Sequence, residues 1–278
     1  MLISIAALVM LAALLHATWN ALLKWQPDAI VGMNIFLVST TVFSLLGVFY
    51  FGVPDADIWL FIIPSLVLHL LYHLFLLSSY RIADFNLAYP ILRGAAPLFA
   101  ALFALLFLGE TPTPLSAVGI ISVCGGVLLL AKGAPFRAVL TALITAVLIA
   151  TYSVVDASGA RQADSALQYA VWVMLLDSVL FLPIALKKRG LSALLSAPKK
   201  VYLCGSIGGL CNVVAYSLVL FAYTNAPVGA VAALREVSVI FGALIGYYLL
   251  KEKTAIRIPG AIVVALGVML IISGNRGA

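Results

Sequence analysis

The stretch ILRGAAPLFAALFALLFLGE, residues 91–110, is apolar almost throughout, yet it carries an arginine, Arg93. Farther along the chain, AALREVSVIFGALIGYYLLKE, residues 232–252, has the same character and carries a second arginine, Arg235. Each stretch is long enough to cross a bilayer as a helix, which takes about 20 residues. The two stretches therefore predict membrane-spanning helices that each bury a permanent charge.

The composition of the whole chain agrees with a membrane protein. Of its 278 residues, 64% are hydrophobic and 9% are charged, whereas a soluble domain has about 25% charged residues. The net charge of +6 is expected from lysines and arginines kept on cytoplasmic loops, so no nucleic-acid partner is predicted. The cysteines Cys124, Cys204 and Cys211 have no CxxC spacing, which argues against a disulfide framework or a metal site.

Ten apolar segments of spanning length follow one another, separated by short loops rich in proline, glycine and charge. They cover residues 3–24, 30–52, 58–79, 85–107, 113–131, 137–157, 167–186, 201–223, 228–250 and 256–274. The longer connection KKRGLSALLSAPKK, residues 187–200, is expected at the membrane surface. We expect an all-α integral protein of ten transmembrane helices in the bacterial inner (plasma) membrane.

The two halves of the chain resemble each other. A shift of 142 residues places Arg93 on Arg235, Glu110 on Glu252 and Gly125 on Gly267, and a shift of 133 places residues 17–19 (ATW) on residues 150–152 (ATY). Each half has an odd number of spans, so the second must be inverted relative to the first. Residues 1–133 and 134–278 are thus predicted to form two inverted five-helix repeats around a central cavity, an arrangement found in transporters.

The repeated pattern resembles the drug/metabolite transporter superfamily, in its ten-span EamA-type branch. The resemblance rests on an apolar span with an internal proline, Pro97, that leads to Leu108-Gly109-Glu110. The second copy runs from Val239 to Leu250-Lys251-Glu252 and lacks both the proline and the loop glycine. The resemblance implies the architecture of a transporter, covers nearly the whole chain and gives no substrate.

Loop charges predict the orientation of the chain in the membrane. Lys24, Arg81, Lys132, Arg137, Lys187, Lys188, Arg189, Lys199, Lys200, Lys251, Lys253 and Arg257 lie on one side, and Arg161 and Arg276 on the other. By the positive-inside rule the first side is cytoplasmic, which leaves both termini outside. The family resemblance instead implies termini inside, and we prefer the charge count.

Both arginines are expected near the middle of the bilayer. Arg93 lies about eight residues into its span and Arg235 about seven, or roughly 11–12 Å deep at about 1.5 Å per residue. A central arginine costs about 3 kcal/mol to insert, so a partner must offset its charge. That partner is either a bound carboxylate or phosphate group or an internal carboxylate. Asp177 is the expected internal partner of either arginine, because Glu236 points away from Arg235 around the helix.

Further polar residues inside the spans are candidates for substrate binding or proton coupling. His16, Trp19 and Asn20 share a helix face, and Tyr89 lies one turn before Arg93. His69 and His73 have metal-binding spacing, but no third ligand is evident, so proton relay, substrate contact or packing remain open. Lys24 and Asp156, at corresponding span ends, are expected to snorkel to the interface. The complete candidate set is Arg93, Arg235, His16, Trp19, Asn20, His69, Tyr72, His73, Tyr89, Asp177, Asn212, Tyr216 and Glu236.

The leading hypothesis is a secondary transporter that moves a small polar metabolite, such as a carboxylate, an amino acid or a phosphonate-like compound, by alternating access. No Walker A motif is present, so the chain supplies no ATPase. We expect no cofactor or metal, a monomer sufficient for the fold, and the lipid bilayer and a small molecule as partners. The alternatives are an exporter of drugs or cationic metabolites, an intramembrane enzyme, or a non-transporting membrane subunit.

Overall fold

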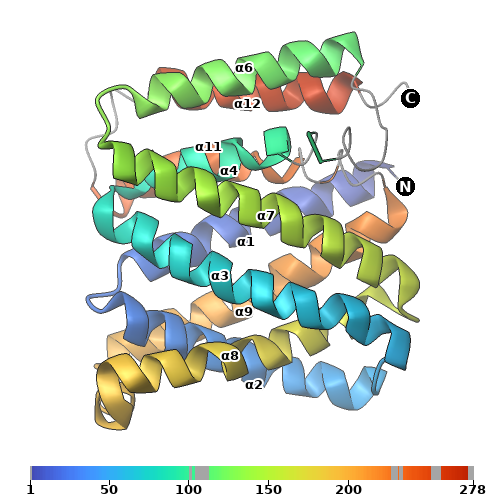
Figure 1. Cartoon of the computed structure of the whole chain (residues 1–278), viewed down its shortest axis with the longest axis vertical. Helices are drawn as coiled ribbons and strands as arrows, with labels where there is room; N and C mark the ends of the chain where they lie inside the picture. Colours follow the sequence, from blue (N-terminus) through green and yellow to red (C-terminus); the bar gives the residue numbers. More distant parts are fainter. Residues whose placement is uncertain are drawn as a thin grey trace.

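The computed structural model describes residues 2–99, 102–103, 113–226, 231, 234–251 and 258–274, and these residues form helices and turns with no strand. The first half contains α1 (Leu2–Lys24), α2 (Ala29–Phe51), the short 3₁₀ helix η1 (Ala56–Ile58), α3 (Trp59–Ile82), α4 (Phe85–Gly94) and α6 (Pro114–Ala131). The second half contains α7 (Phe136–Gln162), α8 (Ala166–Leu195), α9 (Lys199–Asn225), α11 (Ser238–Tyr248) and α12 (Ile258–Gly274). Figure 1 shows these helices running side by side, with the start of α1 and the end of α12 at the same end of the bundle.

Six helical stretches are long and apolar enough to cross a membrane. They are Ile5–Lys24, Ala29–Phe51, Ala56–Ile82, Phe136–Gln162, Ala166–Leu195 and Lys199–Asn225. The apolar helices over Pro114–Gly126, Ser238–Tyr248 and Pro259–Ile271 are shorter. Length and composition thus support six of the expected crossings directly.

Polar residues in the connections explain where several helices begin and end. The Asp28 carboxylate accepts hydrogen bonds from the N–H groups of Ile30 and Val31 and so caps α2, as short polar residues commonly do. Ser165 caps α8 in the same way through the N–H of Leu167. Gly52 ends α2 with a φ of 71°, a backbone conformation that suits glycine.

The segment expected at the membrane surface, residues 187–200, is partly a continuation of α8. The helix bends at Gly190, where φ is 77°, and continues to Leu195. Leu191 and Leu195, which follow the bend, are exposed. The chain reverses after this short helical piece and enters α9 at Lys199.

The expected continuous spans over residues 85–107 and 228–250 are both interrupted, and each interruption adjoins an arginine. The helix α4 ends at Gly94, a turn follows at Ala95, and residues 96–99 are again helical. Pro97 has no N–H to donate to the carbonyl of Arg93, which removes one helical hydrogen bond. In the second half the turn lies at residues 236–237. There the N–H of Val237 donates to the carbonyl oxygen of Leu234 at 3.2 Å, a bond that spans three residues instead of the four of an α-helix.

Helices of the first half pack mainly against helices of the second. The principal partners are α1 with α9, α3 with α7, α2 with α8, α4 with α11, and α6 with α12. Figure 1 shows α6 and α12 together along one edge of the bundle, and α2 and α8 at the opposite edge. The helices α1, α3, α7 and α9 occupy the middle, so their inward faces decide what the centre of the protein contains.

Glycines allow α6 and α12 to approach closely. A Cβ atom at Gly126 would lie 2.8 Å from the backbone nitrogen of Val264 and 2.9 Å from the carbonyl oxygen of Gly260. A Cβ atom added at the adjacent Gly125 would have no neighbouring atom within 4 Å. The two adjacent glycines therefore differ only in what they face.

Gly126→Ala is expected to destabilise the protein by about 1–3 kcal/mol, because one added methyl group must push two backbones apart. Gly125→Ala, the matched control, should be neutral or slightly stabilising, since alanine favours a helix over glycine by up to about 1 kcal/mol. The melting temperatures of both purified variants in detergent measure the difference. Equal melting temperatures would contradict the close α6–α12 packing.

Candidate functional site

Polar side chains from both halves surround a small cavity, here called the central cavity, in the middle of the bundle. Its volume is about 30 Å³. A single water molecule needs about 10–15 Å³ of such space. The described conformation therefore holds a few waters at most. The candidate residues that line it are His16, Trp19, His69, Tyr72, His73, Arg93, Asp177, Asn212, Tyr216 and Arg235.

Three candidates lie outside the cavity lining and have packing contacts instead. Asn20 accepts a hydrogen bond from the Tyr80 hydroxyl at 2.7 Å and joins α1 to α3. Tyr89 is buried and stacks on Phe85, with ring centres 4.7 Å apart. Glu236 is buried and its carboxylate reaches Arg93.

The two arginines have different partners. Arg93 is fully buried, and its Nη2 donates to Glu236 Oε1 at 2.8 Å, an ion pair between the two interrupted helices. Arg235 donates from Nη1 to the Tyr223 hydroxyl at 3.0 Å, and in the described part of the chain it forms no ion pair. Arg93 is thus neutralised within the protein, whereas Arg235 has no carboxylate within ion-pair distance among the described residues.

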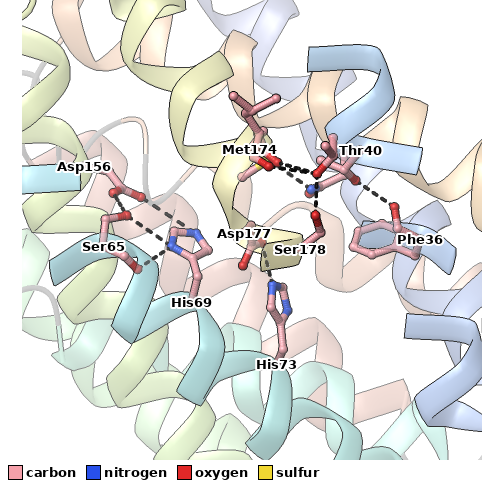
Figure 2. A network of polar contacts seen from close by, with 12 residues as sticks. Phe36, Thr40, Ser65, His69, His73, Asp156, Met174, Asp177 and Ser178 are labelled. Carbon is pink, nitrogen blue, oxygen red and sulfur yellow. Dashed lines mark hydrogen bonds and ion pairs between the residues drawn. The ribbon is translucent and has the colours of Figure 1, made fainter. Parts of the chain in front are cut away.

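Asp177, expected as the partner of an arginine, is bound to a histidine instead. Its Oδ2 lies 2.8 Å from His73 Nε2, and both side chains are almost fully buried. Figure 2 shows His73 on α3 pointing at Asp177 on α8. The prediction that Asp177 neutralises an arginine is therefore wrong, because a histidine one helix away lies closer.

Asp156, expected to snorkel to the interface, lies inside the protein and is 1% exposed. Its Oδ1 accepts hydrogen bonds from the Ser65 hydroxyl at 2.5 Å and from the Tyr169 hydroxyl at 3.1 Å. Its Oδ2 lies 4.0 Å from His69 Nε2. The helix α7 continues to Gln162, so Asp156 is farther from the helix end than the sequence pattern indicated.

Lys24 also has a different role from the expected one. Its Nζ donates to the carbonyl oxygens of Tyr80 at 2.5 Å and Ala83 at 2.9 Å. These carbonyls lie at the end of α3, where helical backbones leave acceptors unpaired. Lys24 therefore caps the end of α3.

Six described lining residues were not among the candidates, and two of them, Tyr152 and Met174, contact candidate residues. Tyr152 lines the central cavity, and its ring stacks on His69 with ring centres 4.3 Å apart. The shift of 133 residues places it on Trp19, a predicted candidate, so the repeat itself contained the signal. Met174 also lines the cavity and receives the Asn212 amide on its sulfur, a contact that sequence spacing cannot reveal.

The hydrogen bond between His16 and Trp19 determines the tautomer of a neutral His16. The indole N–H of Trp19 donates to His16 Nδ1 at 3.2 Å, so a neutral His16 must carry its proton on Nε2. That Nε2 is buried without a partner in the described residues, as are Nε and Nη1 of Arg93. The cavity wall therefore offers several unused N–H donors.

A second hollow, here called the mouth, opens at the end of the bundle where α1 meets α2. It measures about 510 Å³ and its lining includes Lys24, Arg81, Lys188, Arg189 and Asp28. The Phe181 ring lines the mouth and lies 6.5 Å from the ring centre of His73, a central-cavity residue. One layer of side chains therefore separates the two hollows.

An exposed ion pair lies at the mouth. Arg189 Nε donates to Asp28 Oδ2 at 2.5 Å. Burial raises the pKa of Asp28, but the N–H of Val31, the Arg189 guanidinium and the N–H of Ile30 together bring it below its ordinary value. Asp28 therefore stays ionised at neutral pH.

Residues Glu110 and Glu252, which carry part of the repeat and of the family resemblance, lie outside the described residues. Gly125 and Gly267, which the repeat also aligns, both belong to the described residues. A Cβ atom at Gly267 would lie against the backbone of Gly119 and Val123 on α6, whereas Gly125 faces open space. The two glycines thus share a position in the pattern but differ in surroundings.

Comparison with known proteins relates part of the chain to a transporter family. Residues 136–273 match the profile of the EamA-like transporter family. A crystal structure of a protein with 18% sequence identity superimposes with a TM-score of 0.70 over 98% of both chains, and this likeness shows the fold alone. A search of curated proteins found no match. The apolar helices therefore indicate a multi-pass membrane protein, and the match of residues 136–273 to the EamA-like transporter family supports a membrane transporter of the drug/metabolite superfamily.

Proposed function

We propose that the chain is a secondary transporter that moves a small anionic or zwitterionic metabolite by alternating access, without ATP. The observation that carries this proposal is Arg235, a buried cation that lines the central cavity and forms no ion pair in the described residues. A buried charge is costly unless it is paired. A carboxylate or phosphonate group of a substrate would provide the counter-charge and could bind the guanidinium with two hydrogen bonds.

The unused hydrogen-bonding groups of the cavity wall fit the same class of ligand. Arg93 Nε and Nη1 are donors without a partner in the described residues, and a neutral His16 also presents a donor. Asp177 Oδ1 is a buried acceptor, likewise without a described partner. Donors near one part of the cavity and a carboxylate oxygen at another suit a zwitterion such as an amino acid.

The two halves, residues 1–133 and 134–278, are proposed to be inverted five-helix repeats that together cross the membrane ten times. The helix contacts support this reading, because exchanging the halves exchanges the α1–α9 pair with the α3–α7 pair. The same exchange leaves α2–α8, α4–α11 and α6–α12 paired as before. The interruptions near Arg93 and Arg235 also occupy corresponding places in the two halves.

Alternating access is supported by the sizes of the two hollows. The central cavity of about 30 Å³ is too small for a metabolite, whereas the mouth of about 510 Å³ opens at one end of the bundle. We propose that movement of the layer that contains Phe181 connects them, so that the described conformation is closed around the substrate position.

The mouth is proposed to face the cytoplasm of a bacterial cell, with the chain in the inner membrane. Its lysines and arginines belong to the basic side of the molecule, and such residues remain on the cytoplasmic side. In Figure 1 the start of α1 and the end of α12 lie at the other end of the bundle. A cysteine placed at Lys188 in a cysteine-free background should resist a membrane-impermeant thiol reagent in intact cells and react after lysis.

A transporter of cationic metabolites is the competing function. It is favoured by the buried carboxylates Asp156 and Asp177 and by the aromatic rings of Trp19, Tyr72 and Tyr152 in the cavity wall, which attract cations. Each carboxylate, however, lies beside a histidine that can supply its counter-charge, whereas Arg235 forms no ion pair in the described residues.

A thermal-shift screen of the purified protein followed by uptake into proteoliposomes tests the proposal. Amino acids, organic acids and phosphonates are expected to raise the melting temperature, and those that do so should be transported in the absence of ATP. Organic cations serve as the comparison set. A response to cations alone would refute the anionic class, and product formation by protein in detergent would refute transport in favour of an enzyme.

A further inference from the structure

A histidine and an aspartate face each other between α3 and α7 without a hydrogen bond. His69 Nε2 and Asp156 Oδ2 are 4.0 Å apart, beyond the range of a hydrogen bond. Both side chains are almost fully buried. We refer to them as the open pair, which Figure 2 shows beside Ser65.

The surrounding bonds decide where the protons of the open pair lie. His69 Nδ1 is 2.9 Å from the backbone carbonyl oxygen of Ser65, and because a carbonyl only accepts, Nδ1 must carry a proton. In a neutral His69, Nε2 is then an acceptor. Asp156 Oδ2, which has no hydrogen-bond partner in the described residues, is an acceptor as well. Two acceptors therefore face each other, which explains their separation.

The same helix contains the bonded form of this arrangement. One turn along α3, His73 Nε2 lies 2.8 Å from Asp177 Oδ2, so a proton lies between those two atoms. In this closed pair Nε2 of the histidine carries a proton, whereas in a neutral His69 the carbonyl of Ser65 holds the proton on Nδ1. The closed pair also provides an internal reference for the geometry that the open pair would reach.

We propose that the open pair, His69 and Asp156, is a binding site for one proton, taken from water in the central cavity. The proton binds at Nε2 of His69, which then donates to Asp156 Oδ2, and no other bond is made or broken. An N–H···O bond to a carboxylate is about 2.7–2.9 Å long. Binding would therefore draw the facing sides of α3 and α7 together by roughly 1 Å.

The position of the pair suits a proton ligand of the transporter. His69 lines the central cavity, so cavity water reaches it, whereas Asp156 lies behind it and outside the lining. The Tyr152 ring stacked on His69 would favour the charged imidazolium through a cation–π contact. Because α3 and α7 belong to different halves of the chain, the proton would act on the contact between them.

Other ionisable groups face the open pair from every neighbouring helix. They are Tyr72 and His73 on its own helix, Tyr152 on α7, Tyr169 and Asp177 on α8, Tyr216 on α9, and His16, Arg93 and Arg235 across the cavity. The phenols stay neutral near pH 7. The arginines stay charged throughout, and a proton that these groups bind near pH 7 is expected on a histidine.

The test observes the proton directly and needs no substrate. The chain has three histidines, so labelling with ¹⁵N-histidine gives signals from His16, His69 and His73 alone, assigned by His16→Gln and His73→Gln. The labelled protein in nanodiscs is titrated between about pH 5 and 8, where histidines change charge. His69 Nε2 is expected to change from an acceptor to a protonated nitrogen within that range.

Two variants define the site. Asp156→Asn keeps the size of the side chain and an oxygen for Ser65 and Tyr169, but it should weaken proton binding at His69 about tenfold or more, a midpoint at least one pH unit lower. Ser65→Ala removes a donor to Asp156 together with a hydroxyl that lies 3.2 Å from His69 Nδ1, and it should shift the midpoint as well. Asp177→Asn is the matched control and should change the His73 signal more than that of His69.

The inference is overturned if His69 Nε2 keeps one protonation state across the range in the folded wild-type protein. It is also overturned if the titration of His69 is the same in Asp156→Asn and Ser65→Ala as in the wild type. The inference deepens the proposed function by naming the proton as a second ligand of the transporter. A failure of the uptake assay with a normal His69 titration would refute the substrate proposal alone.

Discussion

Replacement of Arg235 by glutamine is expected to reduce transport about 100-fold or more while the protein remains folded. Loss of one partner of a buried, hydrogen-bonded charge pair costs about 2–5 kcal/mol, and each 1.4 kcal/mol is about a factor of ten. In Arg235→Gln the lost partner is the guanidinium group, and the substrate anion is the charge left without a partner. Because Arg235 forms no internal ion pair in the described residues, its removal leaves no carboxylate stranded in the apolar interior.

The measurement is uptake of the compound that the thermal-shift screen identifies, by equal amounts of wild-type and variant protein in proteoliposomes. Arg235→Lys keeps the charge but loses the planar fork, so an intermediate rate is expected. Arg137→Gln, which removes an exposed arginine, is the control and should transport normally. Normal transport by Arg235→Gln, at an unchanged melting temperature, would contradict a substrate contact of this arginine.

The sequence predicted the helical membrane fold and most of the cavity lining because both depend on local patterns. Long apolar runs predict helices whatever their partners, and a polar residue within such a run must face the protein interior. His16, His69 and His73 were identified in this way, and all three line the central cavity. Tyr152 was within reach by the same reasoning, since it corresponds to Trp19 in the repeat.

The pairing of the charges could not be predicted, because it depends on distances between helices far apart in the chain. Arg93 and Glu236 are separated by 143 residues, and His73 and Asp177 by 104. The sequence showed that Glu236 points away from Arg235 on its own helix, but not that it meets an arginine of the other half. Asp156 was misjudged for a related reason, since its burial depends on how far α7 extends and on which helices cover it.

Arg93 and Arg235 occupy equivalent positions in the sequence repeat, but the structure gives them different partners. A substrate contact predicts loss of transport for Arg93→Gln and Arg235→Gln equally. The ion pair with Glu236 adds a structural role to Arg93 that Arg235 lacks. Stability therefore distinguishes them, and Glu236 is the residue through which this is best measured.

Glu236→Gln is expected to lower the free energy of unfolding by about 3–5 kcal/mol, the usual cost of leaving one member of a buried ion pair without its partner. Arg93 and Glu236 are nearly inaccessible, with side chains 1% and 3% exposed, so water cannot replace the lost partner. Arg93→Gln should cost a similar amount for the same reason. The measurement is reversible unfolding in mixed micelles with increasing denaturing detergent.

The double variant Arg93→Gln/Glu236→Gln decides between an ion pair and two independent effects. If the two charges compensate each other, removing both should cost clearly less than the sum of the single changes, since no charge is then stranded. The exposed pair Arg189–Asp28, with side chains 42% and 35% exposed, is the matched control, and breaking it should cost about 0–1 kcal/mol. Additive losses for Arg93 and Glu236 would show that the pair does not hold the interrupted helices of the two halves together.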